Sequence, residues 1–285
     1  MGGRLVAKLS KAQAKQHAEA EKILQQDRLS EDDRLFVIEN WQESARHINS
    51  IAGAFFTPWS LARDFAIEVP AGRMIDLCAG MGTLSLARWW RGQFTQHDRI
   101  SEVVCVEANP DYAAVGRKLL PEARWIVGDV FDLPTDLGHF DAAISNPPFG
   151  IVKRTRSAPR FTGRPFEIHV IDIASDLADW GAFIIPQASA PFRYSGCPAG
   201  GWPATRRDGF GSGYEDCPGE LHATLLAQTG IVMQPNCGID TALCQQEWHG
   251  VSPLCEVVIC DFVEARARRA PPPAEQSDLF AMAAE

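Results

Sequence analysis

The spacing of apolar residues along the chain changes near residue 74. Ahead of it, good helix formers fill Val6 to Gln26, apolar residues recur at helical spacing over Asp32 to Arg46, and Pro58 suits the first turn of a helix ending near Ala66. From Met74 onward, short continuous apolar runs alternate with helical segments. This alternation is typical of a doubly wound α/β domain built on a parallel sheet.

The apolar runs predict the strands of this sheet, and the segments between them predict its helices. Strand-like segments at 230–234 and 254–263 would close the sheet. We therefore expect an α/β, doubly wound, seven-stranded Rossmann-like sheet with an N-terminal helical extension. The other expected strands are residues 74–78, 102–109, 123–130, 140–146 and 181–186, and the expected helices are 83–90, 110–119, 166–180 and 220–230.

The predicted elements divide the chain into three parts. Residues 1–50 form the helical extension, 51–264 form the main domain, and 265–285 form a flexible tail that contains a Pro-rich stretch. Within the main domain, residues 191–236 begin with a long loop rich in Gly, aromatic residues and Arg. Because structureless loops of this length are usually functional or disordered, we expect an insertion there.

Composition narrows the class of protein. With 285 residues, 46% of them apolar, the chain is long enough for one large or two modest globular domains. No apolar run approaches the roughly 20 residues that span a bilayer, and the N-terminus lacks an apolar signal core, so we expect a cytoplasmic protein without a membrane segment. The eight cysteines form no CxxC pair, and Cys78, Cys105, Cys255 and Cys260 lie in apolar strand-like runs. Reduced core thiols and no metal site are therefore expected.

Charge is distributed unevenly along the chain. The net charge of −9 argues against a general nucleic-acid coat protein. The stretch after "SNPPFG", where two prolines end an apolar strand in a rigid corner, nevertheless carries a cluster of cations. Such a cluster can hold phosphate groups, or it can be the solvated face of a surface loop. The cations are Lys153, Arg154, Arg156, Arg160 and Arg164, opposed only by Glu167.

Three predicted strands end in residues suited to binding a ligand. Gly80 and Gly82, after the first strand, allow a tight turn and a close approach of a ligand to the backbone. Glu107 ends the second strand and can accept both hydroxyl donors of a ribose, while Asp129 near the end of the third can accept from an adenine amino group. Doubly wound folds bind ligands at this edge of the sheet. The alternative is a plain turn with acids on surface loops.

Five motifs resemble those of a known family. "DLCAGMG" at residues 76–82, "VEANP" at 106–110 and "VGDVFD" at 127–132 match, in order, the first three motifs of the S-adenosylmethionine-dependent methyltransferases. "SNPPF" at 145–149 matches the Asn-Pro-Pro-aromatic motif of amino-methyltransferases, especially adenine-N6 enzymes. "GAFFTP" at 53–58 resembles the extra cofactor loop of those adenine methyltransferases whose cofactor-binding part precedes the catalytic part.

The resemblance implies both a cofactor and a set of residues that bind it. It covers residues 53–186 and implies that the cofactor is S-adenosylmethionine. The implied cofactor-binding residues are Phe56, Thr57, Pro58, Asp76, Cys78, Gly80, Gly82, Glu107, Ala108, Asp129, Val130 and Asn146.

The resemblance also implies catalytic roles for the corner Asn146, Pro147, Pro148 and Phe149. The exocyclic amine of adenine is a poor nucleophile because its lone pair is delocalised into the ring. In the family mechanism the Asn146 side-chain oxygen and the Pro147 carbonyl would accept hydrogen bonds from that amine and localise the lone pair. Phe149 would stack on the base.

The Asn-Pro-Pro-aromatic motif does not by itself separate DNA, RNA and protein glutamine as substrates, because all three present a planar amino group. A glutamine enzyme more usually has Tyr at the last position, and an RNA enzyme often carries an added RNA-binding domain. The upstream "FFTP" also favours DNA. The expected function is therefore a solitary DNA adenine-N6 methyltransferase acting on double-stranded DNA. An RNA adenine-N6 methyltransferase and a catalytically inactive nucleic-acid-binding adaptor are the alternatives.

Two further interactions are expected outside the motifs. Arg193, Arg206 and Arg207, in the 191–236 insertion, are candidates to contact the target together with the basic cluster. A homodimer on a palindromic site would add reading surface. "QSDLF", Gln276 to Phe280, resembles the motif that binds the bacterial sliding clamp, and the alternative is a frayed tail.

Overall fold

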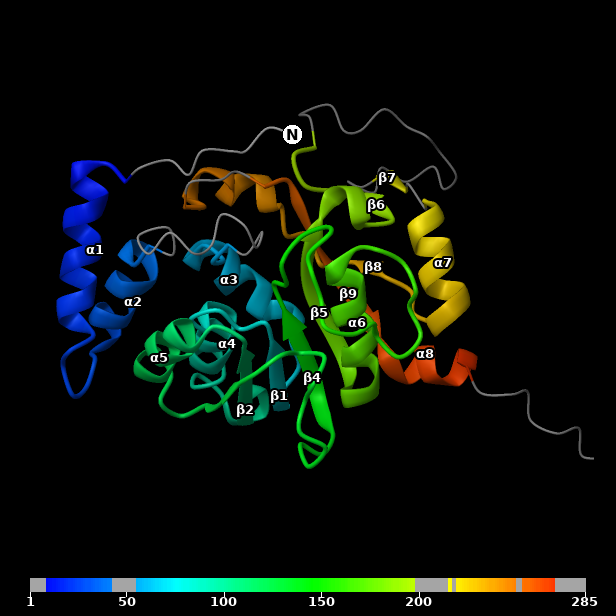
Figure 1. Cartoon of the computed structure of the whole chain (residues 1–285), viewed down its shortest axis with the longest axis horizontal. Coiled ribbons are helices and arrows are strands. Elements are labelled where there is room, and N and C mark those ends of the chain that lie inside the picture. Colours follow the sequence, from blue (N-terminus) through cyan, green and yellow to red (C-terminus); the bar gives the residue numbers. More distant parts are fainter. Residues whose placement is uncertain (1–8, 43–54, 198–214, 217–218, 250–252, 270–285) are drawn as a thin grey trace, which may run out of the picture.

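The computed structural model describes residues 9–42, 55–197, 215–216, 219–249 and 253–269. Within these residues the chain forms a seven-stranded sheet in the order β3-β2-β1-β4-β5-β9-β8, flanked by helices (Figure 1). This confirms the predicted seven-stranded α/β sheet. Its strands are β1 (Gly72–Leu77), β2 (Ile100–Glu107), β3 (Arg124–Val127), β4 (Phe140–Ser145), β5 (Ala178–Pro186), β8 (Gln234–Pro235) and β9 (Cys255–Asp261).

The direction of the last two strands differs from the prediction of a parallel sheet. The neighbours from β3 to β5 pair in parallel, but β9 pairs antiparallel with β5, and β8 pairs antiparallel with β9. The sheet is therefore mixed. An apolar run is equally apolar in either direction, so the sequence pattern carries no sign of the reversal.

Alternate side chains of the strands face opposite sides of the sheet, as the pleat requires. In β2, Val103 and Cys105 join one buried apolar cluster, whereas Val104 and Val106 join the other. Helices cover both clusters, which is the doubly wound arrangement. The first cluster is covered by α3 (Trp59–Phe65), α4 (Thr83–Arg91) and α5 (Pro110–Leu119), and the second by α6 (Phe166–Leu177), α7 (Glu220–Thr229) and α8 (Phe262–Arg269).

The N-terminal extension is formed by α1 (Lys11–Ile23) and α2 (Glu31–Asn40). Each helix begins at a serine, Ser10 or Ser30, whose side chain accepts a backbone N–H three residues later in a capping box. Both helices end earlier than predicted, and α2 ends at Asn40 because Trp41 adopts an extended backbone. Trp41 is only 1% exposed and belongs to the same apolar cluster as α3 to α5. The extension is therefore packed onto the main domain.

Two predicted boundaries are corrected by the structure. The helix expected over 166–180 ends at Leu177, because Ala178 and Trp180 pair with β4 at the start of β5. Residues 265–269, expected to belong to the tail, are part of α8, which runs from Phe262 to Arg269 with Phe262 and Ala265 buried. In both places tertiary pairing or burial outweighs the local pattern.

The expected insertion, residues 191–236, is described in part. It holds a short ribbon of β6 (Phe192–Arg193) and β7 (Glu215–Asp216), followed by α7 and β8. Arg206, Arg207 and the Gln276–Phe280 motif lie outside the described residues. Short 3-10 turns occur at Ala66–Glu68, Gln96–Asp98, Gln187–Ser189 and Thr241–Glu247.

The described ranges contain neither a membrane-spanning helix nor a cluster of metal-ligating side chains. No helix there is both long and apolar enough to cross a membrane. Nor do three or more His, Cys, Asp or Glu side chains gather there as metal ligands would.

Candidate active site

The turn after β1 carries the first predicted motif. Its backbone is left-handed at Gly80 (φ +59°), at Gly82 (φ +83°) and also at Cys78 (φ 65°). A Cβ on Gly80 would lie 3.1 Å from the Phe56 ring, and a Cβ on Gly82 would lie 2.9 Å from the Trp125 ring. Both φ values lie in the left-handed region that favours glycine, and a Cβ at either position would crowd an aromatic ring.

Glu107, the last residue of β2, braces this turn. Its side chain accepts the Gly80 backbone N–H through Oε2 at 2.7 Å and the Asn109 backbone N–H through Oε1 at 2.7 Å. Burial raises the pKa of the Glu107 carboxyl. Because an ionised carboxylate offers about four acceptor positions, Glu107 retains lone pairs for a ligand.

Asp76, in β1, supplies a buried acceptor beside the same turn. It is 1% exposed, and its Oδ2 accepts the Ser85 hydroxyl at 2.7 Å. Its Oδ1 has no hydrogen-bond partner among the described residues. Burial, opposed by the Ser85 hydrogen bond and reinforced by the charge of Glu107, raises the pKa of Asp76 to about 7. A buried acceptor left unpaired costs about 1–3 kcal/mol, so a donor from a ligand would be favourable here.

Asp129, after β3, lies where the cavity meets the basic stretch. Its Oδ1 accepts the Phe131 backbone N–H at 3.0 Å. Its Oδ2 accepts the Thr155 hydroxyl at 2.5 Å. The basic stretch is therefore tied to the strand end that was predicted to bind adenine, although each oxygen keeps a second lone pair.

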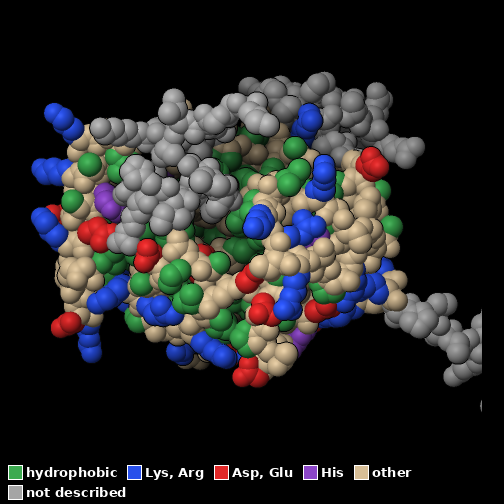
Figure 2. Space-filling view, in the orientation of Figure 1, with side chains coloured by type: hydrophobic (Ala, Val, Ile, Leu, Met, Phe, Trp, Pro, Cys, Tyr) green, Lys and Arg blue, Asp and Glu red, His purple; other side chains and the backbone are tan. Residues whose placement is uncertain are grey.

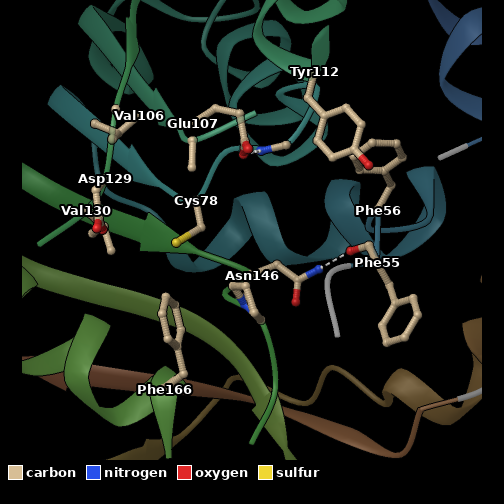
Figure 3. A pocket seen from close by; sticks show the side chains of 14 residues that line it. Phe55, Phe56, Cys78, Val106, Glu107, Tyr112, Asp129, Val130, Asn146 and Phe166 are labelled. Carbon is tan, nitrogen blue, oxygen red and sulfur yellow. Dashed lines mark hydrogen bonds between the residues drawn. The ribbon is translucent and has the colours of Figure 1, made fainter. Parts of the chain in front are cut away.

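These strand ends surround one cavity (Figure 3). A smaller cavity adjoins it and shares part of its lining, including Gly80 and Asn146. Of the predicted residues, the larger cavity is lined by Phe56, Cys78, Gly80, Glu107, Ala108, Asp129, Val130, Asn146 and Pro148, and the smaller one also by Thr57 and Asp76.

Asn146 stands at the end of β4 with its amide in a defined orientation. Its Nδ2 donates to the Phe55 carbonyl at 2.9 Å and to the Thr57 hydroxyl at 3.0 Å. A backbone carbonyl can only accept, so the amide nitrogen must face Phe55 and the oxygen must face away. Figure 3 shows this arrangement, with the oxygen directed away from Phe55. Asn146 therefore offers an acceptor, and not a donor, to the cavity that it lines.

Comparisons with known proteins bear on this geometry. The chain matches no protein-family model and no curated protein sequence. Among solved structures, a Listeria monocytogenes protein assigned to the class I S-adenosylmethionine-dependent methyltransferases has a TM-score of 0.50 at 12% identity, over 89% of this chain and 81% of that one. The chain has the class I methyltransferase fold.

Two other solved structures match this methyltransferase fold less well. The methyltransferase subunit of a type I restriction-modification system from Streptococcus thermophilus has a TM-score of 0.47 and 16% identity, over 81% of this chain and 50% of its own. An rRNA methylase from the same organism has a TM-score of 0.40 and 11% identity, over 72% of this chain and 96% of its own.

Some predicted site residues do not line either cavity of the methyltransferase fold. Pro58 caps α3, and Gly82 caps α4 behind the turn. Pro147 is buried, and Phe149 is partly buried against the apolar cluster that α3, α4 and α5 cover. Placement in the cavity is thus found for the acids and Asn146, whereas these four residues shape its surroundings.

The cavity also contains aromatic residues that sequence reasoning did not single out. Phe55, Tyr112 and Phe166 line it. Phe55 lies within the "FFTP" match itself, and Tyr112 lies in the first turn of the helix after Glu107, so both were near a recognised motif. Phe166 begins α6 and resembled a core residue of an apolar helix face. Phe166 lines the cavity because the loop between β4 and α6 brings the start of α6 back to it.

Arg160, predicted to bind nucleic acid, is instead engaged within the protein. Its guanidinium pairs with Asp172 at 3.0 Å and with Asp176 at 2.5 Å, both on α6. Arg154 is also turned inward, donating to the carbonyls of Gly163 and Arg164. Two carboxylates neutralise the charge of Arg160, so it is less suited to bind a phosphate than an unpaired exposed cation.

Other cations predicted to contact nucleic acid remain at the surface. Lys153, Arg156, Arg164 and Arg193 are exposed, and Arg156 forms an exposed ion pair with Asp132 at 3.2 Å. Figure 2 shows Lys and Arg side chains beside an apolar hollow on this face. Exposed pairs of this kind contribute little to stability, so these side chains are available to a partner.

Proposed function

We propose that the chain is an adenine-N6 methyltransferase that transfers a methyl group from S-adenosylmethionine to a flipped adenine in DNA. The observation that supports this most directly is the orientation of Asn146. Phe55 and Thr57 hold its amide nitrogen, so its Oδ1 is left to accept from a substrate amine. A side chain fixed in this way needs little reorganisation during reaction.

The cavity fits the proposed cofactor, which supplies an electrophilic methyl group on a sulfonium sulfur. The unpartnered Asp76 Oδ1 suits the ammonium group of its methionine part. Glu107 suits the ribose hydroxyls, and Asp129 with Val130 would border the adenine. Because Gly80 has no side chain, a ligand can lie directly against the backbone of this turn.

The corner after β4 would activate the methyl acceptor. Asn146 Oδ1 and the Pro147 carbonyl would accept hydrogen bonds from the adenine amine, which favours a tetrahedral nitrogen with a localised lone pair. The proline ring restricts φ and so helps fix the direction of that carbonyl. Phe149 would stack on the flipped base. With the amine held in line with the methyl group, positioning supplies most of the rate.

DNA is the substrate we propose, because the upstream "FFTP" segment resembles the cofactor loop of adenine DNA methyltransferases. The target base lies inside the duplex, so it must be flipped at a cost of a few kcal/mol. Lys153, Arg156, Arg164 and Arg193 are exposed and would hold flanking phosphates. RNA methylation and an inactive adaptor are the competing outcomes of the test below.

The test is methyl transfer from labelled cofactor to plasmid DNA and, separately, to total RNA, followed by mass spectrometry of the nucleosides. The proposal requires N6-methyladenine in the DNA. Methyladenine in RNA alone would identify the RNA enzyme, and cofactor binding without transfer to either polymer would favour the adaptor.

Asn146→Ala tests the proposed chemistry in the same assay. It should abolish transfer while changing cofactor affinity, measured by calorimetry, far less. Asn40→Ala is a matched control, because Asn40 also donates to a backbone carbonyl, that of Phe36, but belongs to α2. Equal turnover by Asn146→Ala and the parent would remove Asn146 from the mechanism.

A further inference from the structure

Gly150, which directly follows the Asn146–Phe149 corner, is held on both sides of its backbone. Its N–H donates to Glu167 Oε2 at 2.8 Å, and its carbonyl accepts the Phe166 N–H at 2.8 Å. Its φ is +80°, in the left-handed region that favours glycine. The corner is therefore anchored at its C-terminal end, just as Phe55 and Thr57 anchor Asn146 at its N-terminal end.

Glu167 is an unusual residue for this position on α6. It is 1% exposed, and burial raises the pKa of its carboxyl. Burying a carboxylate costs several kcal/mol unless hydrogen bonds offset the loss of water. Glu167 does not line either cavity described above, and its two carboxylate oxygens accept from Gly150 and Ser189 within the protein.

The second carboxylate oxygen of Glu167 joins the corner to another part of the chain. Oε1 accepts the Ser189 hydroxyl at 2.7 Å, in the 3-10 turn after β5. Gln187, in the same turn, donates to the buried Glu256 at 2.6 Å, and Glu256 also accepts the backbone N–H of Tyr194 at 2.9 Å. Glu167 thus connects the corner to the segment that carries Arg193.

We propose that Glu167 is a positioning residue for methyl transfer. It fixes Gly150 and thereby holds the Asn146–Phe149 corner in place relative to the segment that carries Arg193. This inference rests on the proposed function. The hydrogen bond fixes the backbone at Gly150, directly after the corner. It thereby constrains the direction of the Pro147 carbonyl and of the Phe149 ring. The proposed role is one of an acceptor at a fixed distance and does not require proton transfer by Glu167.

Two conservative variants separate acceptor position from charge. Glu167→Gln keeps an acceptor for Gly150 at the same reach and can still bond with Ser189. Glu167→Asp keeps the charge but withdraws the acceptor by one methylene. Asp172→Asn is the matched control, because Asp172 is another buried α6 carboxylate whose partners are Arg160 and Phe161 and not the corner.

Single-turnover transfer, cofactor affinity and amide hydrogen exchange at Gly150 are measured for each variant. We expect Glu167→Asp to slow transfer about 100-fold, as small misplacements do, with cofactor affinity unchanged. Exchange at Gly150 should be about tenfold faster, as the loss of one hydrogen bond permits. Glu167→Gln should stay close to the parent in all three measurements, and Asp172→Asn should leave cofactor affinity and exchange at Gly150 close to those of the parent.

Each contrary outcome overturns the inference. Unchanged transfer in Glu167→Asp would show that the corner needs no such anchor. A loss of transfer in Glu167→Gln, which keeps the acceptor and removes only the charge, would assign the effect to charge. If the parent methylates no polynucleotide, the proposed function fails on its own, whereas exchange at Gly150 still shows whether Glu167 holds the corner.

Discussion

At the scale of single residues, the two adjoining cavities are lined by two acids, Glu107 and Asp76, whose pKa values are raised by burial. Glu107 is stabilised by two backbone N–H donors, whereas Asp76 keeps one oxygen unpartnered among the described residues. This difference assigns them different roles. Glu107 braces the turn at Gly80 even without a ligand, whereas Asp76 gains most from a donor that a ligand brings.

The first prediction concerns the effect of pH on cofactor binding. Since the pKa of Asp76 is raised to about 7, its carboxyl is ionised above that pH and protonated below it. A cofactor ammonium prefers the ionised form, so affinity should fall as pH falls through about 7, by up to about tenfold per pH unit. Calorimetry between pH 5.5 and 7.5 would measure this.

Asp76→Asn is the control for that titration, because an amide does not ionise in this range. It should bind the cofactor weakly with little dependence on pH. If the variant keeps the pH dependence of the parent, the titrating group is another one, and Glu107 would be the first candidate.

At the scale of elements, the basic stretch between β4 and α6 is fastened to α6 by buried polar side chains. His169 Nδ1 accepts the Ala158 N–H at 3.1 Å, and Asp172 Oδ2 accepts the Arg160 and Phe161 N–H groups at 2.8 Å each. Burial lowers the pKa of His169, which favours the neutral ring that this acceptor role requires. The basic stretch is therefore held in a defined conformation, in which some of its cations are exposed and others are paired within the protein.

The second prediction separates these two groups of cations. Replacing the exposed Lys153 and Arg164 by Gln should weaken DNA binding. The slope of log affinity against log salt concentration should become shallower by about 0.9 for each phosphate that is no longer neutralised. Arg160→Gln should leave the slope unchanged, because Asp172 and Asp176 already neutralise Arg160. Affinity measured across a salt series decides between them, and an unchanged slope in the double variant would mean that Lys153 and Arg164 are only solvated.

At the scale of the whole molecule, the N-terminal helices support the wall of the cavity. The Trp41 ring lies 5.7 Å from Phe56 and 5.9 Å from Tyr112, and those two rings meet edge to face at 4.9 Å. Phe56 and Tyr112 both line the cavity. Trp41 also donates to Glu21 of α1 at 2.7 Å, which joins α1 to the same group.

The third prediction is that Trp41→Ala lowers both stability and cofactor affinity. Removing a fully buried aromatic ring typically costs about 3–5 kcal/mol of unfolding free energy, and Phe56 would lose its support. Trp41→Phe should retain most of both, because it keeps a ring at the same place. Urea unfolding and calorimetry measure the two effects. Stability equal to that of the parent would indicate that the N-terminal helices fold apart from the domain.

The sequence by itself determined the seven-stranded α/β sheet and the places where its central strands end. It did so because buried parallel strands need continuous apolar runs, and left-handed turns need glycine at Gly80 and Gly82. Residues at strand ends, such as Glu107, Asp129 and Asn146, could be expected to meet because parallel strands bring their carboxyl ends to one edge.

Only the tertiary structure decided what depends on partners far away in the chain. The reversed direction of β9, the capture of Arg160 by α6 and the packing of Trp41 behind Phe56 have no local signature. The same holds for the orientation of the Asn146 amide, which a carbonyl 91 positions away imposes. The local sequence pattern predicts which residues are buried and where the chain forms a turn. The direction of hydrogen bonds and the pairing of charges depend instead on the groups that the fold brings together.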